Sequence, residues 1–193
     1  MYVDRHFFYL FRSIMAALST RNLQVSGITS GEDIYSLLKR CKKCRMFTNN
    51  GKFIIAHHQL PQLLTNAKTL NNFGCIVNTA SESTTDVAHW FAILKFGKRL
   101  IVCDSLNNMS RYPDVKNNVL AFCSNNNLNY EDLRFSCQQS SSVSCGFISL
   151  FFIAKGSVSS CHSFLSTIHV LRQYSIRTRE KWVLSFVKKH FKL

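Results

Sequence analysis

Residues 89–104 have the sequence HWFAILKFGKRLIVCD, and this stretch decides the fold. Two apolar runs, at 90–96 and 100–103, flank a Gly-Lys pair, and this pattern predicts a β-hairpin. In an antiparallel pair, the start of the first strand lies beside the end of the second strand. We therefore expect His89 and Asp104 at the same end of the hairpin, where an imidazole and a carboxylate can meet.

A second informative stretch begins at Cys145-Gly146 and continues as a nearly all-apolar run to Lys155. It follows a serine-rich segment, 139–144, that we interpret as a loop. The pattern predicts a buried central helix with a cysteine at its N-terminus. The unpaired N–H groups and the positive end of the helix dipole favour a thiolate there. We expect Gly156 to end this helix.

The remaining pattern predicts an α+β fold, with a mixed β-sheet, surrounding helices and the cysteine at the N-terminus of the central buried helix. Further helices are expected at about 31–42, 61–64, 113–125, 160–173 and 178–191, and further strands at 53–56, 75–79 and 133–137. Pro61 and Pro113 are suited to the first turn of their helices.

The chain has 193 residues, of which 46% are hydrophobic, and this is enough for one substantial core. We expect one domain at 28–193 and an N-terminal extension at 1–27, in which Met15 is a second plausible start. The apolar stretch 7–18 is broken by Arg12 and is too short to span a membrane. Without a convincing secretory signal, we expect a reducing compartment and mostly free thiols among the eight cysteines.

The formal net charge of +14 favours a polyanionic partner such as nucleic acid. The alternative is that the basic residues are simply solvated helix faces. The candidate DNA contacts are Lys39, Arg40, Lys42, Lys43 and Arg45 in one run, and Arg172, Arg177, Arg179, Lys181, Lys188, Lys189 and Lys192 in the C-terminal helices. Cys41 and Cys44 form a single Cys-x-x-Cys pair with no second pair and no His pair nearby in sequence, so we expect no metal cofactor.

Four residue types in this order fit cysteine-nucleophile acyl chemistry. Cys145 is the candidate nucleophile, and His89 is the base that takes its proton. Asp104 orients His89, and Gln139 donates a hydrogen bond to an oxyanion. The first three each have a structural alternative: a buried cysteine, a packing histidine and an aspartate that ends a strand.

The segment Cys75-Ile-Val-Asn-Thr-Ala80 is followed, after eight residues, by His89-Trp90. Together with Asp104-Ser105, Gln138-Gln139 and Cys145-Gly146, it resembles the adenovirus cysteine proteases (adenain). The resemblance runs from about residue 28 to about residue 155. The wider superfamily includes the SUMO-deconjugating proteases, which share the order His, acid, Gln, Cys. Papain-like enzymes place Cys first, and chymotrypsin-like viral cysteine proteases need a longer, all-β double barrel.

The resemblance implies several site features. Gln139 has the spacing to Cys145 found in the SUMO proteases, whereas Gln138 has the adenoviral spacing; we favour Gln139 and keep Gln138 as the alternative. Ser144, a small residue before the nucleophile, is similar to the adenoviral branch. Trp90 either stacks on the imidazolium or packs in the core.

The resemblance also implies function. It indicates a viral endopeptidase that cleaves capsid and core precursors at Gly-containing sites during virion maturation, in the virion and the host-cell nucleus. DNA and a short activating viral peptide are implied as cofactors; Cys123 is the nearest candidate for a disulfide to that peptide, although its position matches poorly. We expect a monomer with no membrane partner.

Two other functions remain open. The first is a deconjugating protease for SUMO or ubiquitin-like modifiers, on the same fold. The second belongs to a different class: a basic DNA-binding virion protein without activity.

Overall fold

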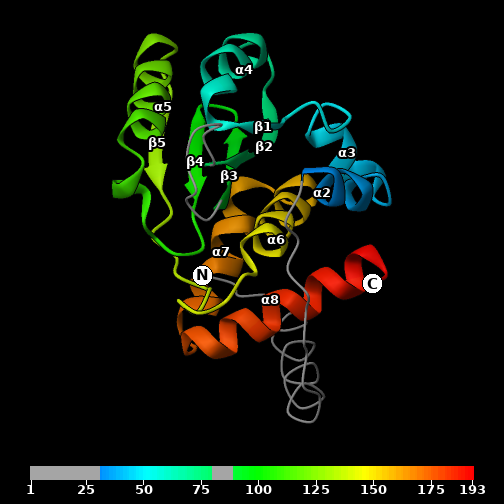
Figure 1. Cartoon of the computed structure of the whole chain (residues 1–193). Helices are drawn as coiled ribbons and strands as arrows, with labels where there is room; N and C mark the ends of the chain where they lie inside the picture. The colour runs from blue at the N-terminus through cyan, green and yellow to red at the C-terminus, as the bar shows by residue number, and fades with distance from the viewer. Residues whose placement is uncertain (1–30, 80–88) are drawn as a thin grey trace.

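The computed structural model describes residues 31–79 and 89–193 (Figure 1). The expected extension at 1–27 lies outside the described residues. The described chain is α+β, with one mixed sheet and helices packed on both of its faces. The expected fold class is confirmed at this level.

The sheet has five strands in the order β1-β2-β3-β4-β5. They are β1 Ile54–Ala56, β2 Asn72–Asn78, β3 Trp90–Phe96, β4 Arg99–Cys103 and β5 Asn129–Asp132. The three central strands are antiparallel to one another, whereas β1 pairs parallel with β2 and β5 pairs parallel with β4. The predicted hairpin is confirmed, because Phe96 pairs with Arg99. Gly97 supplies the positive φ of +56° that this tight turn requires.

Alternating side chains of the central strands enter two separate cores. Phe91 and Ile93 of β3 belong to the core beneath α4 (Leu60–Ala67) and α5 (Pro113–Asn125). Ala92 and Leu94 belong to the larger core on the opposite face. Because both faces are covered, β3 is an almost continuous apolar run rather than an alternating one.

The larger core is built around α6 (Cys145–Val158), whose residues from Cys145 to Ala154 are all buried. Four more helices surround it: α2 (Gly31–Leu38), α3 (Lys42–Phe47), α7 (Cys161–Arg172) and α8 (Ile176–Phe191). Figure 1 shows α6, α7 and α8 below the sheet, with α4 and α5 above it. Among the helices of residues 31–79 and 89–193, none is both long and apolar enough to cross a bilayer.

The helix that begins at Cys145 does not stop at Gly156, as expected, but continues to Val158. A β-carbon at Gly156 would lie 3.2 Å from side-chain atoms of Leu94 and Phe47. The glycine therefore allows close packing inside the helix instead of ending it.

Two other sequence predictions are corrected. The single helix expected at 31–42 is divided into α2 and α3, because Cys41 is extended (φ −121°, ψ 105°) and acts as the N-cap of α3. The strand expected at 133–137 lies earlier in the sequence, at Asn129–Asp132. Arg134 has φ +45°, and the chain leaves the sheet before it. The alternating Leu133, Phe135 and Cys137 are buried against the larger core without strand pairing.

The other helices begin near the expected positions. The short helix at Pro61 extends to Ala67, and α5 runs from Pro113 to Asn125, before the asparagine-rich turn. Two 3₁₀ turns, η1 (His57–Gln59) and η2 (Met109–Arg111), precede α4 and α5 respectively.

Candidate active site

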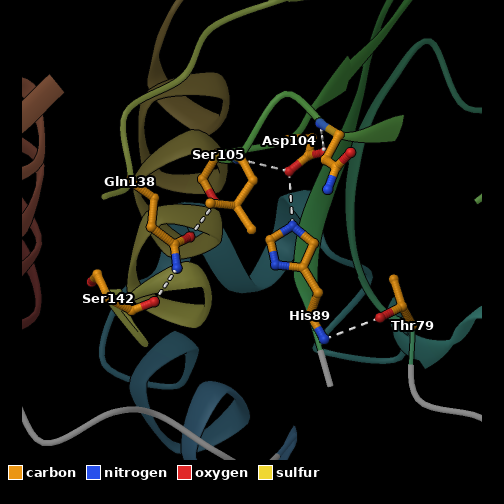
Figure 2. A network of polar contacts seen from close by, with 8 residues as sticks. Thr79, His89, Asp104, Ser105, Gln138 and Ser142 are labelled. Atoms are coloured by element: carbon orange, nitrogen blue, oxygen red, sulfur yellow. Dashed lines mark hydrogen bonds and ion pairs between the residues drawn. The ribbon is translucent and has the colours of Figure 1, made fainter. Parts of the chain in front are cut away.

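The hairpin brings His89 and Asp104 together. His89 immediately precedes β3 and Asp104 immediately follows β4, so the antiparallel pairing places both at one edge of the sheet. Nε2 of His89 lies 2.8 Å from Oδ1 of Asp104, and both side chains are buried (Figure 2). The His89 backbone is fixed to the end of β2, because its N–H donates to Thr79 Oγ1 at 3.0 Å and its carbonyl accepts from the Thr79 N–H at 2.9 Å.

Asp104 is held in place by backbone donors as well as by His89. The N–H of Leu106 donates to Oδ1 at 2.9 Å and the N–H of Asn108 donates to Oδ2 at 2.6 Å. Burial favours the neutral acid, but the His89 hydrogen bond and charge, together with these N–H donors, lower the pKa of Asp104 below its ordinary value. The carboxylate is therefore ionised and oriented before any substrate arrives.

Cys145 is the first residue of α6, and His89 is the neighbouring side chain that most favours its thiolate form. Because Nε2 of His89 faces Asp104, Nδ1 is the ring nitrogen left for the thiol. Burial alone would raise the pKa of Cys145, but the hydrogen bond and charge of His89, with the backbone N–H groups of Trp90 and Gly146, lower it. Burial alone would lower the pKa of His89, but Asp104 and Cys145 raise it to about 9. Opposite shifts at the two partners favour an imidazolium–thiolate ion pair.

Trp90 and Gly146 contribute through their backbones. Their N–H groups favour the thiolate form of Cys145 and so help to lower its pKa. The Trp90 ring is buried in the larger core. The ring that stacks on His89 is that of Tyr112, at a centroid distance of 6.2 Å and an interplanar angle of 12°. Tyr112 was not identified from the sequence, where nothing but its place before Pro113 marks it.

The two glutamines have different surroundings. Gln138 is buried: its Oε1 accepts from Ser105 Oγ at 2.6 Å, and its Nε2 donates to the carbonyl of Ser142 at 2.6 Å (Figure 2). Since a carbonyl can only accept, the orientation of the Gln138 amide is determined. Gln139 is exposed, and its Nε2 donates to Glu180 at 2.8 Å. The geometry thus favours Gln138, not Gln139, as the amide that belongs to the site.

Backbone hydrogen bonds hold Gln138 beside Ser105, the residue that follows Asp104. The carbonyl of Ser105 accepts from the N–H groups of Cys137 and Gln138, at 2.9 and 3.2 Å. The segment after β5 therefore runs beside the segment after β4, so that Asp104 and Gln138 are held by one set of backbone hydrogen bonds.

Glu180 of α8 is a buried carboxylate that sequence reasoning missed. It accepts from Ser144 Oγ at 2.6 Å, and from the backbone N–H and Nε2 of Gln139 at 3.2 and 2.8 Å. It therefore holds both ends of the loop 139–144 that leads to Cys145. In the sequence only its position on the inward face of α8, beside Trp182 and Val183, could have indicated burial.

The predicted basic residues divide into two groups. The guanidinium of Arg179 donates to the carbonyls of Leu171, Ser136 and Arg172, and that of Arg172 donates to the carbonyl of Leu133. These two side chains therefore hold loops in place. The exposed candidates are Lys39, Arg40, Lys42, Lys43, Arg177, Lys181, Lys189 and Lys192, while Arg45 and Lys188 are half-buried.

The two basic runs lie side by side in space. Arg40 Nη1 donates to the carbonyl of Phe191 at 3.3 Å, and Cys41 Sγ lies 3.4 Å from Nε2 of His190. The run 39–45 and the end of α8 consequently form one cationic surface, with Lys42, Lys43 and Lys189 exposed on it.

Two further cysteine regions bear on the expected cofactors. Cys123, the candidate for linkage to an activating peptide, is a buried residue of α5, and burial raises the pKa of its thiol. A disulfide there would require local opening of the protein. Separately, Cys41, Cys44 and His190 bring their three ligand atoms within 4.8 Å of one another.

Comparison with known proteins identifies no family for this chain: no protein-family model matches it, and no curated protein is significantly similar to it.

Proposed function

We propose that this chain is a cysteine endopeptidase of the adenain type. The observation that carries the proposal is the 2.8 Å hydrogen bond between Asp104 and His89, together with the electrostatic coupling of His89 to Cys145, which raises the pKa of His89 to about 9 and lowers that of Cys145. A thiolate, a protonated imidazole and an orienting carboxylate are the groups that acyl transfer by cysteine requires. The α+β architecture with the cysteine opening a buried helix is compatible with an adenain-like fold.

The proposed reaction begins when the Cys145 thiolate attacks the carbonyl carbon of the scissile peptide bond. The carbonyl electron pair moves to oxygen, and a tetrahedral intermediate forms. As the C–N bond breaks, the His89 imidazolium gives its proton to the leaving amine, and a thioester remains on Cys145. His89, now neutral, takes a proton from water, which attacks the thioester and releases the acid product. The proton on His89 and the thiolate are then restored.

We assign the oxyanion donors to the Gln138 amide and the Cys145 backbone N–H. The Gln138 Nε2 carries two hydrogens, of which one is donated to Ser142. The other is proposed to reach the oxyanion. Because Ser105 and Ser142 already orient the amide, it would not have to reorganise during the reaction.

The substrate class rests on the sequence resemblance. We propose capsid and core precursor proteins, cut at Gly-containing sites during virion maturation, in the virion and the host nucleus. A peptide panel with small residues before the scissile bond, tested beside a SUMO–coumarin and a ubiquitin–coumarin substrate, distinguishes this from deconjugation. Preferential turnover of either modifier would overturn the endopeptidase assignment.

Active-site labelling tests the nucleophile directly. The eight cysteines are free, and burial raises the pKa values of Cys44 and Cys75 to about 12. Iodoacetamide at pH 6 should therefore label Cys145 rapidly, and Cys145→Ala should remove that rapid phase. Cys75→Ser is the matched control and should keep it. Labelling of Cys145→Ala at the wild-type rate would contradict the assignment of the nucleophile. A wild-type protein that is not labelled and cleaves no peptide would also contradict it, and would favour an inactive virion protein.

DNA binding is the second part of the proposal, and the cationic surface formed by the run 39–45 and the end of α8 supports it. Contacts to phosphates through Lys42, Lys43 and Lys189 would be independent of base sequence and steeply dependent on salt. We expect Lys42→Glu/Lys43→Glu to weaken binding to a random duplex, with a flatter dependence on salt. Lys98→Glu, on the exposed hairpin turn, is the control. Equal affinity and equal salt dependence for the two variants would exclude this surface.

A further inference from the structure

Cys41, Cys44 and His190 form a group of soft ligand atoms outside the candidate active site. Cys41 is the N-cap of α3, Cys44 lies within α3, and His190 is near the end of α8. The group is therefore assembled from two parts of the chain, because Cys41 and His190 are 149 residues apart in sequence. The sequence argument against a metal at this Cys-x-x-Cys pair assumed that no histidine was near, but the fold supplies one.

The distances in this group match a tetrahedral zinc site. Nε2 of His190 lies 3.4 Å from Cys41 Sγ and 3.7 Å from Cys44 Sγ. Bonds of about 2.3 Å to sulfur and about 2.0–2.1 Å to nitrogen, at a tetrahedral angle, place sulfur and nitrogen about 3.6 Å apart. All three ligand atoms lie within 4.8 Å of one another, so one ion can reach them together.

The surroundings of the group suit a metal ligand set. The His190 ring is stacked on Phe186 at 5.4 Å and meets the edge of Phe191 at 5.0 Å, so its orientation is fixed. Two thiolates would neutralise the charge of a divalent ion.

We propose that Cys41, Cys44 and His190 bind one zinc ion. Two thiolates and an imidazole favour Zn²⁺ over harder divalent ions such as Mg²⁺ and Ca²⁺. Solvent would occupy the fourth coordination position of the ion. Ser157 Oγ lies close to the group, 3.6 Å from Cys44 Sγ. Each thiol loses its proton to solvent as its sulfur–zinc bond forms, and no redox change occurs.

The proposed ion would join α3 to the end of α8. Glu180 near the other end of α8 holds the loop that precedes Cys145. Zinc at His190 would therefore fix the C-terminal part of the helix that supports this loop, in a structural rather than a catalytic role. The proposal does not depend on the protease assignment.

Zinc content is the test, measured in the Cys145→Ala protein so that the candidate active site cannot contribute a thiolate. After incubation with zinc under reducing conditions and gel filtration, we expect about one zinc per chain by mass spectrometry. Adding Cys44→Ser or His190→Gln should reduce the bound zinc at least about tenfold. Cys161→Ser, a half-buried cysteine on α7, is the matched control and should retain it.

Cobalt substitution gives a second readout that needs no further variant. The Cys145→Ala protein titrated with Co²⁺ should develop thiolate-to-cobalt charge-transfer absorption and intense d–d bands of a tetrahedral site, both removed by zinc. Zinc content unchanged by Cys44→Ser would overturn the proposal. So would reduced protein that takes up neither ion, including the case in which Cys41 and Cys44 are recovered as a disulfide.

Discussion

Nε2 of His89 and Oδ1 of Asp104 are 2.8 Å apart because the two residues terminate paired strands of one tight hairpin. The distance is set by backbone pairing, and each partner is then fixed again by its own neighbours: Thr79 holds the His89 backbone, and the N–H groups after β4 hold the carboxylate. The helix that begins at Cys145 packs across β3, so the thiol approaches the imidazole from a separate element. Such an arrangement allows each side chain to be tested independently.

Asp104→Asn should reduce kcat/KM about 10²–10⁴-fold while leaving the fold intact. The amide cannot stabilise the imidazolium by charge, so the pKa of His89 should fall from about 9 towards its ordinary value. The measurement is a pH–rate profile. Its basic limb, set by loss of the imidazolium proton, should move to lower pH in the variant. Asp114→Asn, at an exposed position on α5, is the control and should be unchanged.

The alkylation rate of Cys145 should depend on pH differently from that of an ordinary thiol. Its pKa is lowered, so the thiolate, and hence the rapid reaction, should persist as the pH falls below the ordinary thiol value. His89→Ala removes the largest of the stabilising contacts and should shift the midpoint of the alkylation rate to higher pH. Identical midpoints for the wild type and His89→Ala would contradict the ion pair.

Gln138→Ala and Gln139→Ala form a matched pair. If Gln138 donates to the oxyanion, its loss should cost about 10²–10³ in kcat, or about 2.7–4 kcal/mol, with little change in KM. Gln139→Ala should have a much smaller effect, because Gln139 is exposed and its amide donates to Glu180 instead of facing the candidate active site. Steady-state kinetics of both variants decides between the residues, and the reverse order of effects would restore Gln139.

Sequence patterns predicted the parts of this site that depend on local order. The hairpin followed from two apolar runs around a glycine, and the helix at Cys145 from an apolar run after a loop. The sequence favoured Gln139, whereas the geometry favours Gln138, because the choice depends on which amide faces Ser105, 33 residues away from Gln138. Glu180 and His190 were missed for the same reason, since their partners lie 41 and 149 residues away.

The incorrect element boundaries also have a physical cause. The alternation at Leu133, Phe135 and Cys137 reflects burial of one side of an extended segment, and such burial does not require strand pairing. The division between α2 and α3 depends on the cap at Cys41, which hydrogen-bonds the Cys44 N–H through sulfur. Cysteine is not among the residues preferred as N-caps, so the sequence carried no signal for this break.

Glu180→Gln should destabilise the protein without changing the size of the side chain. A glutamine amide has one oxygen and one NH2 group, so it can accept from Ser144 or from Gln139 but not from both, and one of these donors would lose its acceptor. We expect a loss of about 1–3 kcal/mol, with about 2–4 °C in Tm for each kcal/mol. Amide hydrogen exchange should also accelerate in the loop 139–144. Glu32→Gln, at an exposed position in the first turn of α2, is the control.

Gly74→Ala should be more destabilising than Gly156→Ala, although both glycines lie against the same core. A β-carbon at Gly74 would stand 2.5 Å from Phe47 and 2.6 Å from Ile153, closer than carbon atoms can approach. Those side chains would have to move within a packed core, at a cost of about 1–3 kcal/mol. At Gly156 the nearest atoms are 3.2 Å away, and alanine gains about 1 kcal/mol of helix propensity that offsets the crowding. Urea denaturation of the two variants measures the difference; equal midpoints would contradict the packing of β2 against α6.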